Sequence, residues 1–346
     1  NIMGKRSRER TPPIRLPGRP MPSARPDYLE DFLVSLIREF RGAYAPDSEW
    51  VKSTVDYFED DLRRYLGTYF PRSFLETYEI AVELFGKVFG SGVSTDGELK
   101  LLDIGCGMGG ASLGLLFAVL ERFAVKKVVL DGFDANDDSL EFFQKILRSS
   151  AYAKAREALR ANDVPGAGAE VEVHLQKGAL SREKFSLLQA DSPYDVILTS
   201  KMLNELDVEA KYFRFLENYL PHLTKHGVCF VIDVNDRRDR LHISQHLSKE
   251  ARCFLREYDE FNSLLPPGCK DCAEYESRCQ DFIQIVCRET NFDRLDPGAK
   301  RGVSKVCCRV FCRQELYRYL KDQLIRFDFL ASEAGENHVY CPRLHS

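Results

Sequence analysis

The chain has 346 residues, of which 44% are hydrophobic and 29% are charged, and its formal net charge is −4. This length and composition are typical of a globular protein with a large core, arranged as one large domain or two modest ones. No apolar stretch is long enough to span a bilayer, and the slightly negative charge excludes a global basic field for nucleic acid. We therefore expect no membrane association, and RNA binding would need a local basic patch.

The first 26 residues form a basic, proline-rich segment. Residues 1–26 contain six prolines and seven Lys or Arg against one Glu, a composition that cannot bury a core and predicts a flexible tail. A solvated tail is the simpler interpretation, and an arm that binds RNA is the alternative. No apolar core follows the basic residues, so we expect no signal peptide. The eleven scattered cysteines then indicate reduced thiols in an intracellular protein, in the cytoplasm or an organelle.

Residues 27–95 are predicted to form a helical cap region. Three stretches carry apolar residues at spacings of three and four: 27–40, 48–66 and 73–89. This periodicity predicts about three amphipathic helices. Ser73 and Glu76 have the spacing of a capping box, which predicts that the third helix begins at Ser73. The glycine-rich residues 90–98 predict a linker into the next unit.

From Leu99 onward, strand-like and helix-like segments alternate, which predicts a domain over residues 96–346 that includes a C-terminal helix. The expected strands are 99–104, 127–133, 170–176, 194–199, 227–233, 280–288 and 305–313. Helices are expected between most of them, at 109–122, 136–161, 206–223 and 242–264. This alternation predicts an α/β, Rossmann-like fold with a seven-stranded, mostly parallel sheet and helices on both faces. Ligands of such sheets bind at the carboxyl ends of the strands.

A glycine-rich loop, Gly105–Gly110, follows the first predicted strand. It matches the G-x-G-x-x-G pattern of dinucleotide-binding enzymes, which is a weak signal alone. Asp103 lies two residues before the first glycine, where an acid suits a cationic amino group and would repel a pyrophosphate. Asp134 follows the second strand, where it could accept bonds from both ribose hydroxyls of an adenosine. The alternatives are a nicotinamide dehydrogenase and a turn in which the glycines serve only close packing.

The order D-x-G-x-G-x-G, followed by an acid after the second strand, resembles the class I S-adenosylmethionine-dependent methyltransferases over roughly residues 99–313. The resemblance implies S-adenosyl-L-methionine as cofactor, with Asp103 near its amino group and Asp134 on its ribose. The family often has an acid after the third strand, and this chain has none, so the adenine would contact the backbone of Ala179 and Leu180. The implied cofactor-binding residues are Asp103, Gly105, Cys106, Gly107, Gly109, Asp134, Ala135, Ala179, Leu180 and Thr199.

Polar side chains follow the fourth and fifth strands, at the edge that would overlook the methyl donor. The sequence lacks the N/D-P-P-Y/F/W tetrad of base-amino methyltransferases and shows no Lys-Asp-Lys-Glu set of ribose methyltransferases. The candidate catalytic residues are Lys201, Asn204, Glu205 and Asp233. Glu205 could act as a general base, although a helix-capping role explains it equally well. Asp233 could orient a substrate amine or could pair with nearby arginines.

The cysteines offer a candidate metal site. Cys269, Cys272 and Cys279 form a C-x2-C-x6-C run, and Cys308 lies in a second cysteine group. Four such thiolates could hold zinc or an iron–sulfur cluster. The run, together with the stretch Met202–Leu206, is similar to the mitochondrial small-subunit methyltransferase-like assembly factors. The alternative is cysteine used as a small hydrophobic residue in a buried strand.

The sequence therefore predicts an enzyme, an S-adenosylmethionine-dependent methyltransferase whose acceptor is a small molecule or a protein side chain. The rival hypothesis is a methyltransferase-like assembly factor that binds RNA or the ribosome through its basic tail and carries a Cys-ligated zinc or iron–sulfur site. Salt-dependent RNA binding would favour the rival. Loss of activity without loss of fold on replacing Asp134 would favour the enzyme.

Overall fold

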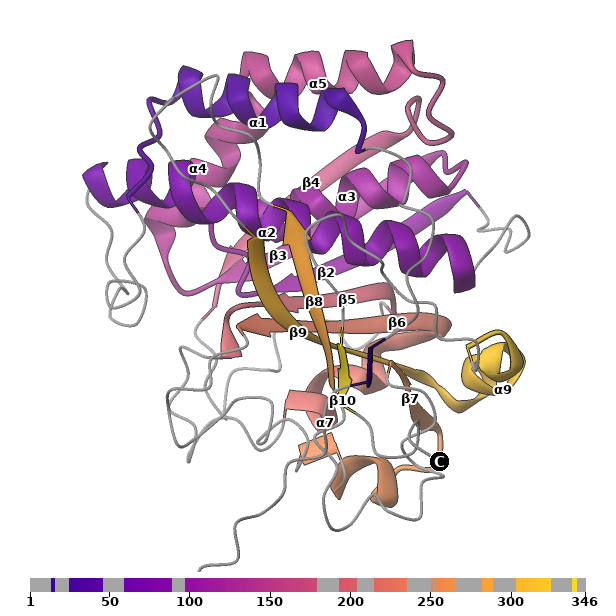
Figure 1. The fold of residues 1–346 in the computed structure, drawn as a ribbon. Helices are drawn as coiled ribbons and strands as arrows, with labels where there is room; N and C mark the ends of the chain where they lie inside the picture. Colours follow the sequence, from indigo (N-terminus) through magenta and orange to yellow (C-terminus); the bar gives the residue numbers. More distant parts are fainter. Residues whose placement is uncertain are drawn as a thin grey trace, which may run out of the picture.

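The structure, a computed structural model, describes residues 14–15, 25–45, 59–88, 97–178, 193–203, 215–234, 250–251, 253–265, 282–288, 303–324 and 338–340. Within these residues one twisted sheet runs through the molecule, with several long helices on one face and shorter helical segments on the other (Figure 1).

Five parallel strands form one half of the sheet. Their spatial order is β4 (Glu170–Lys177), β3 (Lys127–Asp134), β2 (Glu98–Ile104), β5 (Tyr194–Ser200) and β6 (Leu223–Val234). The chain first adds strands on one side of β2 and then returns to add β5 on its other side. Such a reversal opens a crevice at the carboxyl ends of the two central strands, here β2 and β5.

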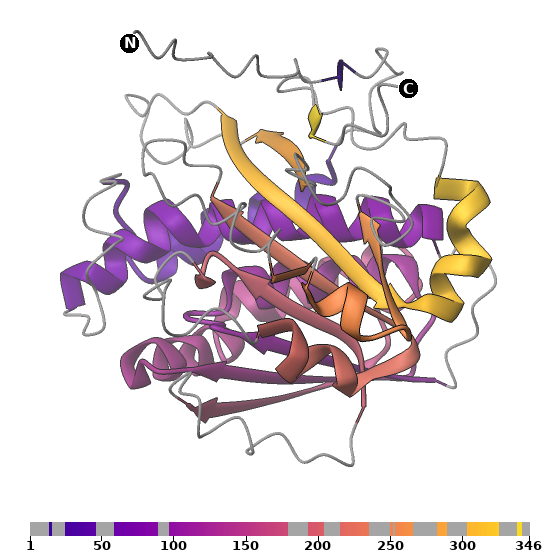
Figure 2. The ribbon, with the colours of Figure 1, turned by 90° about the horizontal axis from the view of Figure 1, so that it is seen from below.

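In the other half of the sheet, one long strand pairs with all of its neighbours in antiparallel orientation. This strand, β9 (Val303–Arg313), pairs with β6 along one edge and with β8 (Phe282–Arg288) and β7 (Phe261–Leu265) along the other, and it crosses the sheet diagonally in Figure 2. Two short strands, β10 (His338–Tyr340) and β1 (Ile14–Arg15), follow beyond β8. The predicted Rossmann-like fold is confirmed with all seven predicted strands, and β7, β10 and β1 are additional.

Five helices cover one face of the sheet: α1 (Asp27–Glu39), α2 (Glu59–Val88), α3 (Gly110–Arg122), α4 (Asp137–Leu147) and α5 (Ser150–Ala161). α2 and α3 lie in close contact, because a Cβ atom on Gly114 would stand 2.2 Å from the Phe74 carbonyl oxygen. The rings of Phe32, Phe74 and Phe117 join α1, α2 and α3, with centroids 5.4–5.6 Å apart. The helical cap therefore shares one apolar core with the sheet.

The prediction of a helix start at Ser73 is wrong. α2 is one continuous helix of 30 residues with Pro71 in its interior, and Ser73 and Glu76 are both buried in it. A proline inside a helix costs about 3 kcal/mol, so the packing of α2 on α3 has to outweigh that cost. Just before the proline, the Thr68 hydroxyl donates to the Ala43 carbonyl and accepts from the Ala45 amide, which braces the helix there.

Other helix predictions also need correction. The predicted helix 136–161 is divided into α4 and α5 where the Ser149 side chain caps α5 by accepting from the Tyr152 amide. In the predicted helix 242–264, residues 253–257 are helical, but Phe261 begins β7. All five β7 residues are buried. The strand therefore lacks the alternation of buried and exposed residues by which strands are usually predicted.

The described part of the predicted helix 206–223 is short. It consists of α7 (Phe215–Tyr219) and a 3-10 turn, η5 (Leu220–His222), and β6 begins at Leu223. Toward the end of the chain, α9 (Gln314–Leu324) matches the predicted C-terminal helix.

The predicted tail, residues 1–26, lies almost entirely outside the described residues, so its RNA-binding role and the domain boundaries remain predictions. Arg25, at its end, pairs with Glu79 on α2. No helix in the described part of the chain combines the length and the apolar composition that a membrane crossing requires.

Candidate functional site

The glycine loop lies at the carboxyl end of β2, between that strand and α3. Gly105, Gly107 and Gly109 all have positive φ angles, of 76°, 52° and 86°, a conformation that side chains with a Cβ atom rarely adopt. The amides of Gly105 and Cys106 both donate to the Phe133 carbonyl of β3, at 2.8 and 3.0 Å. The loop is therefore held in a fixed shape against the end of the neighbouring strand.

The three glycines leave room for different groups. A Cβ atom on Gly105 would stand 2.3 Å from Met202, and one on Gly109 would stand 2.3 Å from the Phe143 ring. The side-chain position of Gly105 is therefore filled by Met202, and the role of Gly105 in cofactor binding stays a prediction. At Gly107 the nearest atom is the Tyr65 hydroxyl at 3.6 Å. Gly107 is therefore the glycine of the loop that leaves space for a ligand.

Asp103 lies under this loop as a buried carboxylate. Its side chain is fully buried, and one oxygen accepts a hydrogen bond from the Ser112 hydroxyl of α3. The other oxygen, Oδ1, receives no hydrogen bond from any described residue. Burial raises the pKa of Asp103 to about 7, opposed by the Ser112 bond and assisted by the nearby Asp134 charge. A buried carboxylate oxygen without a donor is costly, so a cationic donor from a ligand would stabilise it.

Asp134, at the end of β3, holds the glycine loop. Its Oδ2 accepts from the Gly107 amide at 2.8 Å, and its Oδ1 accepts from the Asn136 amide at 2.9 Å. Burial raises the pKa of Asp134, and these backbone bonds oppose the rise. A carboxylate has about four lone-pair sites, and the Ala135 backbone also bonds to Asp134, so the side chain can still accept one hydroxyl group. The next residue, Ala135, is exposed, whereas the Cys106 thiol is buried against Gly132.

Three polar residues lie at the end of β5, close to the glycine loop: Thr199 and Ser200 end the strand, and Lys201 follows it. The hydroxyl oxygens of Thr199 and Ser200 are buried and make no hydrogen bond to a described residue. Lys201 has a φ of 57°, and its amide donates to the Ile232 carbonyl of β6 at 2.8 Å. Its Nζ lies 2.5 Å from the Glu76 Oε2 of α2. Glu76, which the sequence predicts only as part of a capping box, is not among the predicted site residues, and its one further signal is an acid within an apolar, helix-like stretch.

Asp233, the predicted catalytic acid at the end of β6, lies in a different environment. It is buried, and its Oδ1 accepts from the Val234 amide at 2.7 Å. Its charge contributes to a raised thiol pKa of about 12 at Cys307 of β9, which is caused mainly by burial.

Several predicted site residues lie outside the described part of the chain: Ala179, Leu180, Asn204, Glu205, Cys269, Cys272 and Cys279. Of the predicted metal ligands, the structure describes Cys308, which is buried in β9 between Ile232 of β6 and Ile283 of β8. Burial raises its thiol pKa. The described residues contain no group of His, Cys, Asp or Glu side chains that could hold a metal ion. The position of Cys308 fits a small hydrophobic residue of the core.

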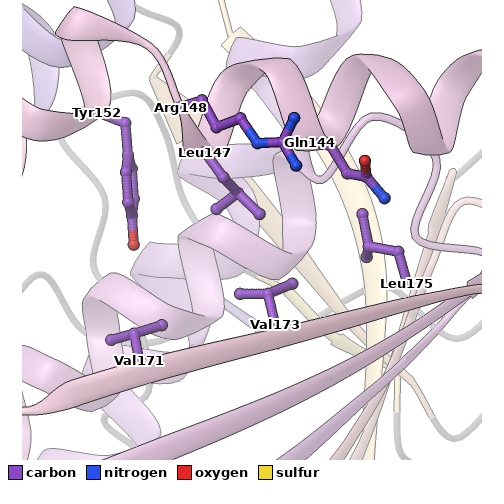
Figure 3. A pocket seen from close by; sticks show the side chains of 7 residues that line it. All are labelled: Gln144, Leu147, Arg148, Tyr152, Val171, Val173 and Leu175. Carbon is purple, nitrogen blue, oxygen red and sulfur yellow. The ribbon is translucent and has the colours of Figure 1, made fainter.

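A surface pocket of about 320 Å³ lies away from the glycine loop, between β4 and the junction of α4 and α5. Val171, Val173 and Leu175 form its apolar floor, and Arg148 and Tyr152 lie along its rim (Figure 3). None of the predicted site residues is among its lining residues. The carboxyl ends of β2, β3 and β5 therefore remain the candidate site.

No protein-family model matches the sequence, and no curated protein is similar to it. Several solved structures of methyltransferases are similar to the chain. The plantazolicin methyltransferase in complex with SAH is 10% identical, with a TM-score of 0.40 over 82% of this chain and 95% of that one. A putative RNA methyltransferase from Pyrococcus horikoshii is 13% identical, with a TM-score of 0.39 over 84% and 99%.

A third similar structure, the glycopeptide N-methyltransferase complexed with S-adenosylmethionine, is 12% identical, with a TM-score of 0.38 over 70% of this chain and 95% of that one. None of these three is a mitochondrial assembly factor, so they give no support to that resemblance. At such identities and TM-scores the likeness does not identify a reaction. The functional inference therefore rests on the residues of the site.

Proposed function

We propose that this protein is an S-adenosylmethionine-dependent methyltransferase. The observation that carries the proposal is Asp103, a fully buried carboxylate whose Oδ1 has no donor among the described residues. An isolated charge in such a place is unfavourable unless a cation or a donor pairs with it. The α-amino group of S-adenosylmethionine supplies both.

The rest of the loop fits the same cofactor. The side-chain position of Gly107 has no atom closer than the Tyr65 hydroxyl at 3.6 Å, and Asp134 can still accept a ribose hydroxyl. An acid beneath a glycine loop would repel the pyrophosphate of a dinucleotide, which argues against a nicotinamide dehydrogenase. When bound, S-adenosylmethionine supplies an activated methyl group on a sulfonium. The protein then has to align an acceptor with it and exclude water.

The first test is calorimetric titration of the full chain with S-adenosylmethionine and, separately, with NAD. We expect binding of S-adenosylmethionine alone, and we expect Asp134→Asn to weaken it by roughly 10- to 100-fold, because one charged hydrogen-bond acceptor contributes about 1.5–3 kcal/mol. The amide oxygen can still accept from one backbone amide, so the loop should keep its shape.

Asp131→Asn is the matched control. Asp131 lies on the same strand and accepts from the Tyr194 hydroxyl at 2.8 Å, away from the glycine loop. It should leave the dissociation constant unchanged. Binding of NAD in place of S-adenosylmethionine, or equal effects of the two substitutions, would contradict the proposal.

A further inference from the structure

The Glu76–Lys201 ion pair connects the helical cap to the edge of the candidate site. Glu76 lies on α2 with 1% of its side chain exposed, and Lys201 follows β5 with 19% exposed. The Lys201 Nζ lies 2.5 Å from the Glu76 Oε2. Neither carboxylate oxygen of Glu76 receives a hydrogen bond of regular geometry from a described residue, so Oε2 has the ion-pair contact alone. A carboxylate buried only to hold a helix in place would gain from a second donor.

The backbone at Lys201 is in an uncommon conformation for its residue type. Its φ of 57° lies in the left-handed region, although lysine has no special tolerance for it. Residues held in such conformations cost about 1–3 kcal/mol and cluster at functional sites. The next residue, Met202, packs against Gly105 of the glycine loop. Lys201 therefore stands directly beside the loop that would hold the cofactor.

α2 contacts this region at a second place. The Tyr65 hydroxyl lies 3.6 Å from the point where a Cβ atom on Gly107 would stand, so the helix approaches both the glycine loop and Lys201. In the ion pair the carboxylate is on the buried side and the ammonium on the more open side. Of the two partners, the Lys201 ammonium is therefore the one that a bound acceptor can reach.

We propose that Glu76 is a positioning residue that holds the Lys201 ammonium toward the methyl acceptor, and that the acceptor is an oxygen acid, either a carboxylate or an acidic hydroxyl. This inference rests on the proposed methyltransferase function. An ammonium donates hydrogen bonds to an oxyanion and favours its charged form, whereas it repels a protonated amine. An oxygen acid therefore suits this position better than an amine.

The methyl transfer balances without a general base when the acceptor is an oxyanion. The acceptor oxygen forms a bond to the methyl carbon while the bond between that carbon and the sulfonium sulfur breaks. The negative charge of the oxygen and the positive charge of the sulfur cancel, which leaves a methyl ester or ether and a neutral thioether. Lys201 keeps its protons throughout, and Glu76 keeps Lys201 in place.

The test uses the full chain with four probe acceptors, and the formation of S-adenosylhomocysteine as the readout. Benzoate, para-nitrophenol and protocatechuate are the oxygen acids, and benzylamine is the amine. We expect turnover of at least one oxygen acid and not of benzylamine. Lys201→Met should lower kcat/KM roughly 100-fold, as loss of one donor to a reacting oxygen does elsewhere, and Lys201→Arg should retain part of the activity.

A double variant with the two charges exchanged tests whether the ion pair positions the Lys201 ammonium or only attaches α2 to the end of β5. Glu76→Lys combined with Lys201→Glu restores an ion pair between α2 and the end of β5 but removes the donor from the acceptor side. We expect this variant to recover the thermal stability that Glu76→Gln loses, while turnover of the oxygen acids stays at the level of Lys201→Met. Glu79→Gln is the matched control, because it breaks the Arg25 ion pair one turn along the same helix. It should not change turnover.

Each other outcome overturns a defined part of the argument. Recovery of turnover in the double variant, or wild-type turnover in Lys201→Met, would show that the ion pair is only structural. The Lys201→Met result decides the question even if the double variant does not fold. Turnover of benzylamine, or of none of the oxygen acids, by a protein that binds S-adenosylmethionine would overturn the acceptor class. A wild-type protein that does not bind S-adenosylmethionine would overturn the proposed function itself.

Discussion

The affinity of this protein for S-adenosylmethionine is expected to fall about tenfold for each pH unit below 7. Burial raises the pKa of Asp103 to about 7, so in the free protein the carboxyl group is mostly protonated below that pH. A cationic amino group pairs with the ionised form only. Binding below pH 7 must therefore expel a proton, and each pH unit adds a tenfold cost. Above pH 7 the affinity should level off, and it should fall again at the pH where the α-amino group of the ligand loses its proton.

The same raised pKa has an opposite consequence for the stability of the free protein. The folded state binds a proton at Asp103 that the unfolded state, with an ordinary carboxyl pKa near 4, has already lost. The contribution of Asp103 to stability is therefore largest below about pH 4 and is lost as the pH rises through 7. The described groups near this carboxyl are the Ser112 hydroxyl of α3, the charge of Asp134 on β3 and the buried Cys106 thiol of the glycine loop. All three remain in place in the variants below.

Calorimetry at pH 6 and pH 8, in buffers of different ionisation enthalpy, measures both the dissociation constant and the protons released. Asp103→Asn should abolish the proton release and weaken binding roughly 10- to 100-fold at pH 8, in keeping with about 1.5–3 kcal/mol for a charged hydrogen bond. Asp195→Asn is the matched control, since Asp195 lies near the other end of β5 and accepts from the Lys100 amide at 2.9 Å. Burial also raises its pKa. Wild-type affinity that does not change between pH 5.5 and 7.5 would contradict the role given to Asp103.

The sequence predicts the strands well because their signals are local. The β2 stretch is a mainly apolar run that contains Asp103 near its end and is followed by glycines, and these features can be read from the sequence alone. The β7 strand shows the limit of this reasoning. Its five residues are all buried, so they carry no alternation, and only pairing with β9 defines them as a strand.

The sequence predicts the cofactor side of the candidate site and, on the acceptor side, Lys201 but not Glu76. Asp103 and Asp134 follow strands, so parallel topology brings them to one edge of the sheet. Glu76 is on α2, and its spacing from Ser73 imitates a capping box while Pro71 imitates a helix boundary. Its role becomes visible only when α2 packs on α3 and places the carboxylate beside Lys201. Tertiary contacts of that kind leave no pattern in a single sequence.

Gly114→Ala is expected to destabilise the protein by about 1–3 kcal/mol, the usual cost of overpacking a well-packed core. In an isolated helix the same change would be favourable by roughly 0.5–1 kcal/mol, because alanine is the better helix former. Here the new Cβ atom would stand 2.2 Å from the Phe74 carbonyl oxygen and 3.0 Å from its carbonyl carbon. Both atoms belong to the backbone of α2, so the whole helix would have to move.

Gly86→Ala is the matched control for this change, because Gly86 is also in a helix, α2, and its nearest neighbour would be the flexible Arg122 side chain at 3.5 Å. It should be neutral or slightly stabilising in chemical denaturation, opposite in sign to Gly114→Ala. A displaced α2 also carries Glu76 away from Lys201, so Gly114→Ala should lower methyl transfer more than it lowers S-adenosylmethionine binding. Equal unfolding midpoints for the two variants would contradict the close approach of α2 and α3. They would also contradict the inference that this packing places Glu76 beside Lys201.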